Sequence, residues 1–261
     1  MRKVNDIIKE MERIAPTFLK EDFDNVGLMV GDREKSVKKV LLALDCTLKV
    51  IEEAKRENAD LIITHHPLIF RKPSNITTDT LQGKKIIELI KNDISLYSSH
   101  TNLDSVENGL NHTIVSMLGF ENSKIIEKNK REESAGLGRI VKLQAVITLE
   151  ELVEKVKKSL KINNLRVVKG NDNILKIAII NGSGQDFIGK AVSLGVDTII
   201  TGDTTYHFAS DYKEIGINII DIGHFASEQI VFFNVMERLK EKFDDIDFIT
   251  SNVEDDPYSF Y

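Results

Sequence analysis

Two adjacent histidines, His65 and His66, follow directly on the apolar run Leu61–Ile63 and on Thr64. Neutral imidazole is the commonest metal ligand, and it is also the side chain most easily tuned for acid–base chemistry near neutral pH. Pro67 biases His66 away from helical geometry, so we expect the pair on an extended turn at the carboxyl end of a strand, where open α/β sheets bind ligands. The pair could serve two ions side by side, or one ring could bind an ion while the other forms a hydrogen bond. Taken alone, the pair is equally consistent with a surface turn.

A second pair of ligand-type residues, His224 and Glu228, lies four residues apart at the start of a predicted helix that runs through residues 229–240. This spacing places both side chains on one helix face, one turn apart, which is the arrangement of helical metal motifs. A carboxylate in the first helical turn is also explained by the helix dipole alone, but that explanation does not account for His224. A further carboxylate, Asp104, follows a predicted strand and could equally cap the next helix.

These residues form one candidate metal-ligating set, all of whose members lie just past predicted strand ends: His65, His66, Asp104, His224 and Glu228. A mixed set of imidazoles and carboxylates suits zinc, iron(II), manganese or nickel. Five ligands exceed the need of one tetrahedral zinc but fit two divalent ions that share a carboxylate, for which we select Glu228. Such a pair would activate water near neutral pH and polarise a carbonyl, C=N or phosphoryl group.

The elements that would position these residues alternate between strands and helices. A buried strand at 40–45, a helix at 48–58 and the strand at 60–64 form a β-α-β unit, whose crossover should be right-handed. The first half of the chain also predicts an amphipathic helix over 3–15, further helices at 83–92 and 109–118, and a strand at 94–98.

The second half of the chain repeats the first. A strand at 175–180, a helix near 186–194 and a strand at 197–201 repeat the earlier unit, so that Asp60 matches Asp197 and Thr64 matches Thr201. The two histidines match Gly202-Asp203, so the repeat is structural and its chemistry differs. We therefore predict an α/β protein of two similar lobes that arose by internal duplication, with the metal site in the cleft between them. The charged segment 127–138 places the boundary, which gives an N-terminal lobe of residues 1–126 and a C-terminal lobe of residues 127–261, with the C-terminal helix packing back on the first lobe.

Five segments of the chain occur in the order of a known family's signatures: Asp24-Asn25-Val26-Gly27-Leu28, Ile63-Thr64-His65-His66-Pro67-Leu68, His100-Thr101-Asn102-Leu103-Asp104, Gly202-Asp203 through Tyr206-His207, and Asp221-Ile222-Gly223-His224-Phe225-Ala226-Ser227-Glu228. In these segments the chain resembles the GTP cyclohydrolase 1 type 2-like family (NGG-interacting factor three-like). The resemblance covers residues 24–228. It implies two similar α/β lobes, a two-metal site between them and a ring-shaped homohexamer. The family's metal ligands fall on the five residues of the candidate set without departure.

Two functions use this set of ligands. The first is a metal-dependent hydrolase acting on a nucleotide or related small molecule, such as one that opens the purine ring of GTP, with His100 as the proton donor or as an oriented neighbour of the ions. The alternative is a non-catalytic metal-handling or regulatory interaction protein. The chemistry of His207 is left open.

The composition limits the remaining function classes. The net charge of −6 argues against broad binding of a nucleic-acid backbone. No apolar run reaches the length of a membrane span, so no membrane association is expected. The single cysteine, Cys46, allows no internal disulfide, which favours a reducing cytoplasm. Cys46 follows an apolar strand, and we expect a packed thiol there rather than a nucleophile.

Overall fold

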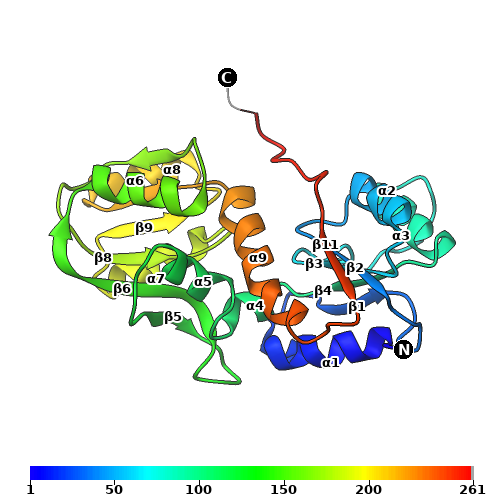
Figure 1. Cartoon of the computed structure of the whole chain (residues 1–261). Coiled ribbons are helices and arrows are strands. Elements are labelled where there is room, and N and C mark those ends of the chain that lie inside the picture. Colours follow the sequence, from blue (N-terminus) through cyan, green and yellow to red (C-terminus); the bar gives the residue numbers. More distant parts are fainter. Residues whose placement is uncertain (260–261) are drawn as a thin grey trace. The chain divides into compact units, whose positions relative to one another are not determined.

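The computed structural model describes residues 1–259 of the chain, which divide into two compact units (Figure 1). Unit 1 comprises Met1–Leu103 and Phe232–Asp255, and unit 2 comprises Asp104–Val231 with the segment that follows from Asp256. The division falls within two helices, α4 (Thr101–Ser105) and α9 (His224–Lys240).

Unit 1 is built on a five-stranded sheet in the order β1-β4-β3-β2-β11, in which only the β1–β4 pair is antiparallel. Its elements are α1 (Val4–Ile14), the short 3-10 helix η1 (Thr17–Leu19), β1 (Gly27–Val30), β2 (Lys39–Ala43), α2 (Leu48–Glu57), β3 (Leu61–Thr64), α3 (Leu81–Lys91), β4 (Ser95–Ser98) and β11 (Asp247–Thr250). The strands, helices and β-α-β unit expected in residues 3–98 are confirmed to within two residues at each end.

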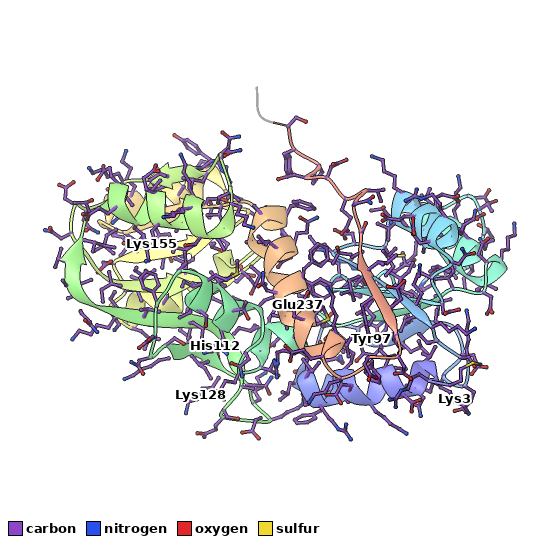
Figure 2. All side chains as sticks on the ribbon, viewed as in Figure 1. Lys3, Tyr97, His112, Lys128, Lys155 and Glu237 are labelled. Carbon is purple, nitrogen blue, oxygen red and sulfur yellow. The ribbon has the colours of Figure 1, made fainter. Side chains whose placement is uncertain are left out.

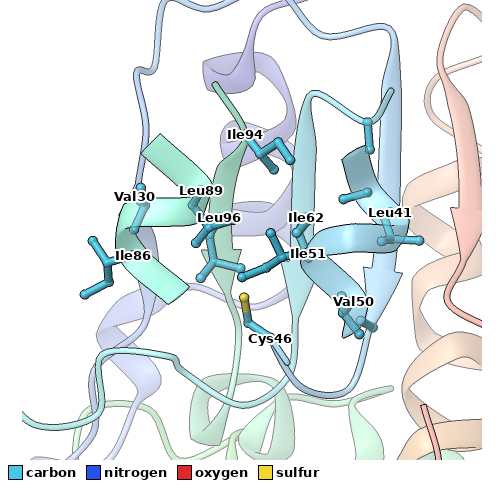
Figure 3. Packing of buried hydrophobic residues seen from close by; sticks show 13 residues of the cluster. Val30, Leu41, Cys46, Val50, Ile51, Ile62, Ile86, Leu89, Ile94 and Leu96 are labelled. Carbon is cyan, nitrogen blue, oxygen red and sulfur yellow. The ribbon is translucent and has the colours of Figure 1, made fainter. Parts of the chain in front are cut away.

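The core of unit 1 lies where α2 and α3 cover one face of this sheet (Figure 3). Leu41, Ile62 and Leu96 project from neighbouring strands into this cluster, and Ile51 meets them from α2. Cys46 is part of the same cluster and is 4% exposed; burial raises the pKa of its thiol to about 12. The expectation of a packed cysteine is therefore confirmed, because a thiol with this pKa does not form a thiolate near neutral pH.

Unit 2 is built on a six-stranded sheet in the order β5-β6-β8-β9-β10-β7. Its elements are α5 (Leu110–Met117), β5 (Lys124–Lys128), β6 (Gly136–Ile147), α6 (Leu149–Leu160), β7 (Arg166–Val168), β8 (Ile174–Ile179), α7 (Gln185–Ser193), β9 (Thr198–Thr201), α8 (Tyr206–Glu214) and β10 (Asn218–Asp221). The segment 127–138, where the sequence placed the lobe boundary, lies within unit 2 because it contains the end of β5, the turn and the start of β6, which pair as antiparallel neighbours.

The two units share one arrangement of elements. The order β2-α2-β3-α3-β4 in unit 1 corresponds to β8-α7-β9-α8-β10 in unit 2, with three parallel strands in each. An antiparallel edge strand pairs with the last parallel strand in both units, namely β1 with β4 and β7 with β10. These correspondences confirm two similar lobes and extend the predicted repeat by one helix and two strands in each unit.

In both units, charged side chains lie mainly on the surface and apolar side chains fill the core. Lys3, Lys128 and Lys155 are exposed on their units, whereas Tyr97 on β4 is 1% exposed inside unit 1 (Figure 2). In unit 2 a capping box begins α6: the Thr148 hydroxyl accepts from the Glu151 N–H, and the Glu151 carboxylate accepts from the Thr148 N–H.

Candidate metal centre

The carboxyl ends of β2, β3 and β4 bring three histidines of unit 1 together. Ala43, Thr64 and Ser98 are register partners across these parallel strands, so the residues that follow them emerge at one edge of the sheet. His65 and His66 emerge from β3, and His100 emerges from β4. One ring nitrogen from each histidine lies within 4.8 Å of one from each of the others. Three imidazoles at this spacing could hold a divalent ion.

Each of these rings is oriented by an oxygen atom at its Nδ1. His65 Nδ1 lies 2.9 Å from the Ser99 carbonyl oxygen, His66 Nδ1 lies 3.0 Å from Asp45 Oδ1, and His100 Nδ1 lies 2.9 Å from Asp24 Oδ1. An imidazole that donates from Nδ1 carries its lone pair on Nε2, which is the tautomer that metal-ligating histidines adopt when a carboxylate or carbonyl stands behind them.

Asp24 is the most strongly held of these oxygen acceptors. Its side chain is fully buried, and it accepts hydrogen bonds from the backbone N–H and the hydroxyl of Thr101 as well as from His100. Burial alone would raise the pKa of Asp24, but the hydrogen bond and charge of His100, together with the Thr101 hydrogen bonds, lower it to about 2. Asp24 therefore stays ionised and fixes the His100 ring.

Unit 2 carries His224 and Glu228 at the corresponding edge of its own sheet. His224 is the first residue of α9, after β10, and its Nδ1 lies 2.7 Å from Oδ2 of Asp203, which follows β9. His224 Nε2 lies 3.1 Å from Glu228 Oε2, as expected for residues one helical turn apart. A fourth imidazole is thus oriented at Nδ1 by an oxygen atom.

Asn181, which follows β8, connects the two predicted carboxylates of unit 2. Its side-chain Nδ2 donates to Asp104 Oδ1 and to Glu228 Oε1, each at 2.9 Å. Asn111 supports this arrangement, because its side chain accepts from the Asn181 N–H at 3.0 Å and donates to the Asp104 carbonyl at 3.2 Å. Asp104 and Glu228 are 7% and 3% exposed. Two buried carboxylates held by one amide are a favourable environment for a cation.

Gly182, next to Asn181, allows Glu228 to reach this position. A Cβ at Gly182 would lie 2.3 Å from Glu228 Oε1, and the residue has a φ of +57°. Both the close approach and the left-handed backbone conformation require glycine. A cavity of about 710 Å³ also borders His224 in unit 2, and its lining includes Arg166, Asp221 and Phe225.

The structure brings His65, His66 and His100 together in unit 1, and it brings Asp104, His224 and Glu228 together in unit 2. His207 lies on the exposed surface of α8, with its ring 5.3 Å from that of Tyr206.

The orienting residues were not identified as functional from the sequence. Asp24 and Asp203 lie within segments that carry the family resemblance, so the resemblance could have identified them. Asp45, Asn111 and Asn181 lie outside those segments, and only the folded structure brings them to their partners.

Comparison with known proteins decides the family. The profile of the Duf34/NIF3 (NGG1p interacting factor 3) family matches residues 2–257. The chain belongs to the Duf34/NIF3 family. This Duf34/NIF3 chain is 60% identical over 260 residues to a Clostridium perfringens protein named GTP cyclohydrolase 1 type 2 homolog, covering 99% of each. It is 38% identical to a protein of the same name from Methanocaldococcus jannaschii, covering 87% of this chain and 90% of that one.

Solved structures of Duf34/NIF3 relatives share the fold. A Bacillus cereus protein related to NIF3 superposes with a TM-score of 0.91 at 28% identity, covering 100% of this chain and 99% of that one. Reduced HcgD from Methanocaldococcus jannaschii superposes with a TM-score of 0.84 at 34% identity, covering 96% and 98%. The family and the two-lobed α/β fold expected from the sequence are thereby confirmed. Within residues 1–259, no helix combines the length and apolarity needed to span a bilayer.

Proposed function

We propose that this Duf34/NIF3 chain binds two divalent metal ions through His65, His66, Asp104, His224 and Glu228, and that it hydrolyses a nucleotide or a related small molecule. The observation that supports this proposal is that the three predicted ligand histidines are oriented in the same way, each with an oxygen acceptor at Nδ1. A surface turn or an ordinary helix start requires no such repeated arrangement, whereas metal-ligating histidines do.

The residues fit divalent ions of intermediate hardness. Imidazole nitrogens with carboxylate oxygens suit zinc, iron(II), manganese or nickel. When bound, such ions supply Lewis acidity and activate water near neutral pH. Glu228 is proposed as the shared ligand because its two oxygens have different neighbours, Asn181 at Oε1 and His224 at Oε2. Asp104 and Glu228 would remain oriented by the Asn181 amide.

His100 is proposed as the group that moves a proton. Its Nδ1 is held by Asp24, so Nε2 is the atom available for proton exchange with a substrate. The buried, ionised Asp24 would stabilise the imidazolium form that arises when His100 accepts a proton.

The substrate class rests on two supports. The name of the relatives, GTP cyclohydrolase 1 type 2 homolog, suggests a guanine nucleotide. The cavity of about 710 Å³ beside His224 has the size of a small-molecule pocket.

The test is metal stoichiometry combined with turnover. Protein purified without chelator and reloaded with each defined metal should hold close to two ions per chain by elemental analysis. Glu228→Ala should lose both ions, because a shared carboxylate holds each of them, whereas Asp104→Ala should lose mainly one. A stoichiometry that stays at one or below would refute the dinuclear site, and equal losses in the two variants would remove Glu228 from the shared position.

A non-catalytic metal-handling or regulatory role is the second candidate, and the family's name, which describes an interacting factor, favours it. The same reloaded protein would be assayed with nucleotides and phosphoesters. Absence of turnover with every metal, together with ready transfer of metal to an acceptor, would select this second role.

We also propose self-association as a homohexamer, on the family resemblance alone. Light scattering should then give about six times the chain mass of 29.5 kDa. A monomer that persists at all concentrations would contradict it.

A further inference from the structure

Two exposed phenylalanines stand beside the histidine cluster of unit 1. Phe23 is 66% exposed and Phe70 is 41% exposed. Their ring centroids lie 6.3 Å apart at 61°, and the Phe70 ring lies 6.3 Å from the His100 ring at 79°. A row of rings therefore leads from Phe23 through Phe70 to His100, whose ring in turn lies 5.1 Å from that of His65.

Both phenylalanines belong to loops that are anchored to the metal-binding edge. Asp24 follows Phe23 and is bound to His100 and to Thr101. Asn25 donates from its side chain to the carbonyl of Ile69, the residue before Phe70, at 2.5 Å. The loop that carries Phe23 is thus tied to the loop that carries Phe70 and to the edge that carries His100.

Phe23 and Phe70 differ from singly exposed apolar side chains such as Phe18, because their rings contact each other and lead to His100. Exposure of apolar surface is unfavourable, and exposed apolar side chains that gather in one place are typical of binding sites. Aromatic rings favour offset or edge-to-face contact with another ring at centroid distances of 4.5–7 Å, and the Phe23–Phe70 and Phe70–His100 contacts fall within that range. One further planar ring could extend this row.

We propose that Phe23 and Phe70 form a platform on which the planar, unsaturated ring of the substrate stacks, next to His100. This inference rests on the proposed function, and it specifies the part of the substrate that residues of unit 1 contact. The substrate class it names is a planar heterocycle, because a saturated phosphoester has no π-face for these rings to contact. The imidazoles beside the platform would then face atoms of the stacked ring.

The test compares two probes that differ only in the ring. Guanosine 5′-monophosphate and ribose 5-phosphate share the sugar and the phosphate, so any contact of the phosphate with metal or cations is common to both. Isothermal titration of the metal-reloaded full chain should show guanosine 5′-monophosphate binding about 5- to 150-fold more tightly, as stacking of a base on aromatic side chains provides. Phe23→Leu and Phe70→Leu should each reduce this ratio, and the double variant should bring it close to one.

Two matched variants act as controls. Phe18→Leu changes a phenylalanine of η1 that is 55% exposed in the same unit, and it should leave the ratio unchanged. Phe225→Leu changes an aromatic residue that lines the cavity beside His224 in unit 2. If Phe225→Leu brings the affinity ratio of the two probes close to one while the Phe23 and Phe70 variants preserve it, the guanine ring binds in unit 2. That result would overturn the proposal.

Metal content and molecular mass, measured on every variant, separate this proposal from the proposed function. Equal affinities of the two probes for a wild-type chain that holds two ions would overturn the platform and leave the metal site standing. A ring preference that depends on both phenylalanines in a chain that binds no metal would support the platform and refute the proposed function. A change in oligomeric mass in the Phe23 and Phe70 variants, with the ratio unaffected, would assign the patch to contact between chains and overturn the proposal.

Discussion

Asp60 and Asp197 bind equivalent backbone groups in the two units. Asp60 Oδ2 accepts from the N–H groups of Lys38 and Lys39 at 2.8 and 3.1 Å. Asp197 Oδ2 accepts from Leu175 and the residue that follows it at 2.9 and 2.8 Å. Each aspartate precedes the second parallel strand of its unit and fixes the start of the first. Both copies of the repeat have therefore kept these hydrogen bonds between the aspartate and the neighbouring strand, while the residues beyond the strand ends differ.

Substitution of either aspartate should cost similar stability. Asp60→Ala and Asp197→Ala each remove an acceptor for two backbone N–H groups, so we expect a loss of about 1–3 kcal/mol in the free energy of unfolding, measured by urea titration. Asp244→Ala, at an exposed position, should change it by less than about 0.5 kcal/mol. A large loss of unfolding free energy at one aspartate with none at the other would show that the hydrogen bonds of the two aspartates are not equivalent.

Asn181→Ala should weaken metal binding without unfolding the chain. The substitution removes the amide that orients Asp104 and Glu228, and loss of such an orienting partner typically costs about 10- to 100-fold in metal affinity. Metal affinity would be measured by competition with a chromophoric chelator. Asn171→Ala removes an amide that donates to the Gly216 carbonyl elsewhere in unit 2 and should preserve the affinity. Unchanged affinity in Asn181→Ala would mean that the carboxylates need no such support.

Gly182→Ala should displace Glu228, because the new Cβ would lie 2.3 Å from its Oε1. We expect loss of metal together with about 1–2 kcal/mol of stability from the left-handed backbone. Gly119→Ala is the matched control, since Gly119 has a φ of +67° and the nearest atom to its Cβ, Lys155 Nζ, lies 3.7 Å away. It should lose stability but keep its metal. Full metal content in Gly182→Ala would show that Glu228 tolerates the displacement.

The stability of unit 1 should depend on the ionisation of Glu254. Burial raises the pKa of this carboxyl to about 7, and the charges of Asp45 and Glu53 act in the same direction, while the N–H groups of Asp45 and Leu44 oppose the rise. The unfolded chain releases this proton near its ordinary pKa of 4.5, so the folded state alone holds it between there and about pH 7. The free energy of unfolding should therefore fall as the pH rises through this window, by about 1–2 kcal/mol after allowance for partial exposure.

Glu254→Gln should remove that pH dependence, because the glutamine side chain does not titrate. Thermal unfolding at several pH values between about 4.5 and 8 measures the difference between the variant and the wild type. Glu241→Gln, at an exposed position, serves as the control. An identical fall in stability in the wild type and in Glu254→Gln would assign the effect to another group.

Bound metal should leave the protein in mild acid before the fold is lost. His65, His66 and His224 bind metal only when neutral, and an ordinary imidazole has a pKa of about 6.5. Affinity should fall steeply below about pH 6, while the helical far-UV circular dichroism persists because the cores of the two units consist of apolar residues. Retention of metal until the fold itself melts would contradict the proposed ligands.

The sequence predicted the elements whose residues are apolar and regularly spaced. The buried strand Leu61–Thr64 and its counterpart Thr198–Thr201 could be found because strands covered on both faces are continuously apolar. The strand Lys124–Lys128 was not predicted, and its last two residues fall in the charged segment 127–138 that was interpreted as the lobe boundary. An edge strand carries charged residues that protect it from pairing with other chains, so its sequence does not show the apolar pattern of a buried strand. The strand Asp247–Thr250 was also missed, since it pairs with Lys39–Ala43 from the distant end of the chain.

For the candidate site, the sequence predicted the ligand residues but not the residues that orient them. His65, His66, His224 and Glu228 were found from residue type and spacing, because their neighbours along the chain define strand ends and a helix start. Asn181 was not, since its partner carboxylates are distant along the chain and only the folded sheet of unit 2 brings them within 2.9 Å. Orienting residues of this kind depend on tertiary contacts that no local pattern records.

The buried thiol of Cys46 has a practical consequence for the preparation of this protein. A thiol that is 4% exposed, with a pKa of about 12, reacts slowly with oxygen, alkylating agents and disulfides at neutral pH. With no other cysteine in the chain, folded protein should neither cross-link nor need a protective reductant during purification. Thiol reductants such as dithiothreitol compete for zinc, iron and nickel through their sulfur atoms, so buffers that omit them are the appropriate medium in which to count the ions.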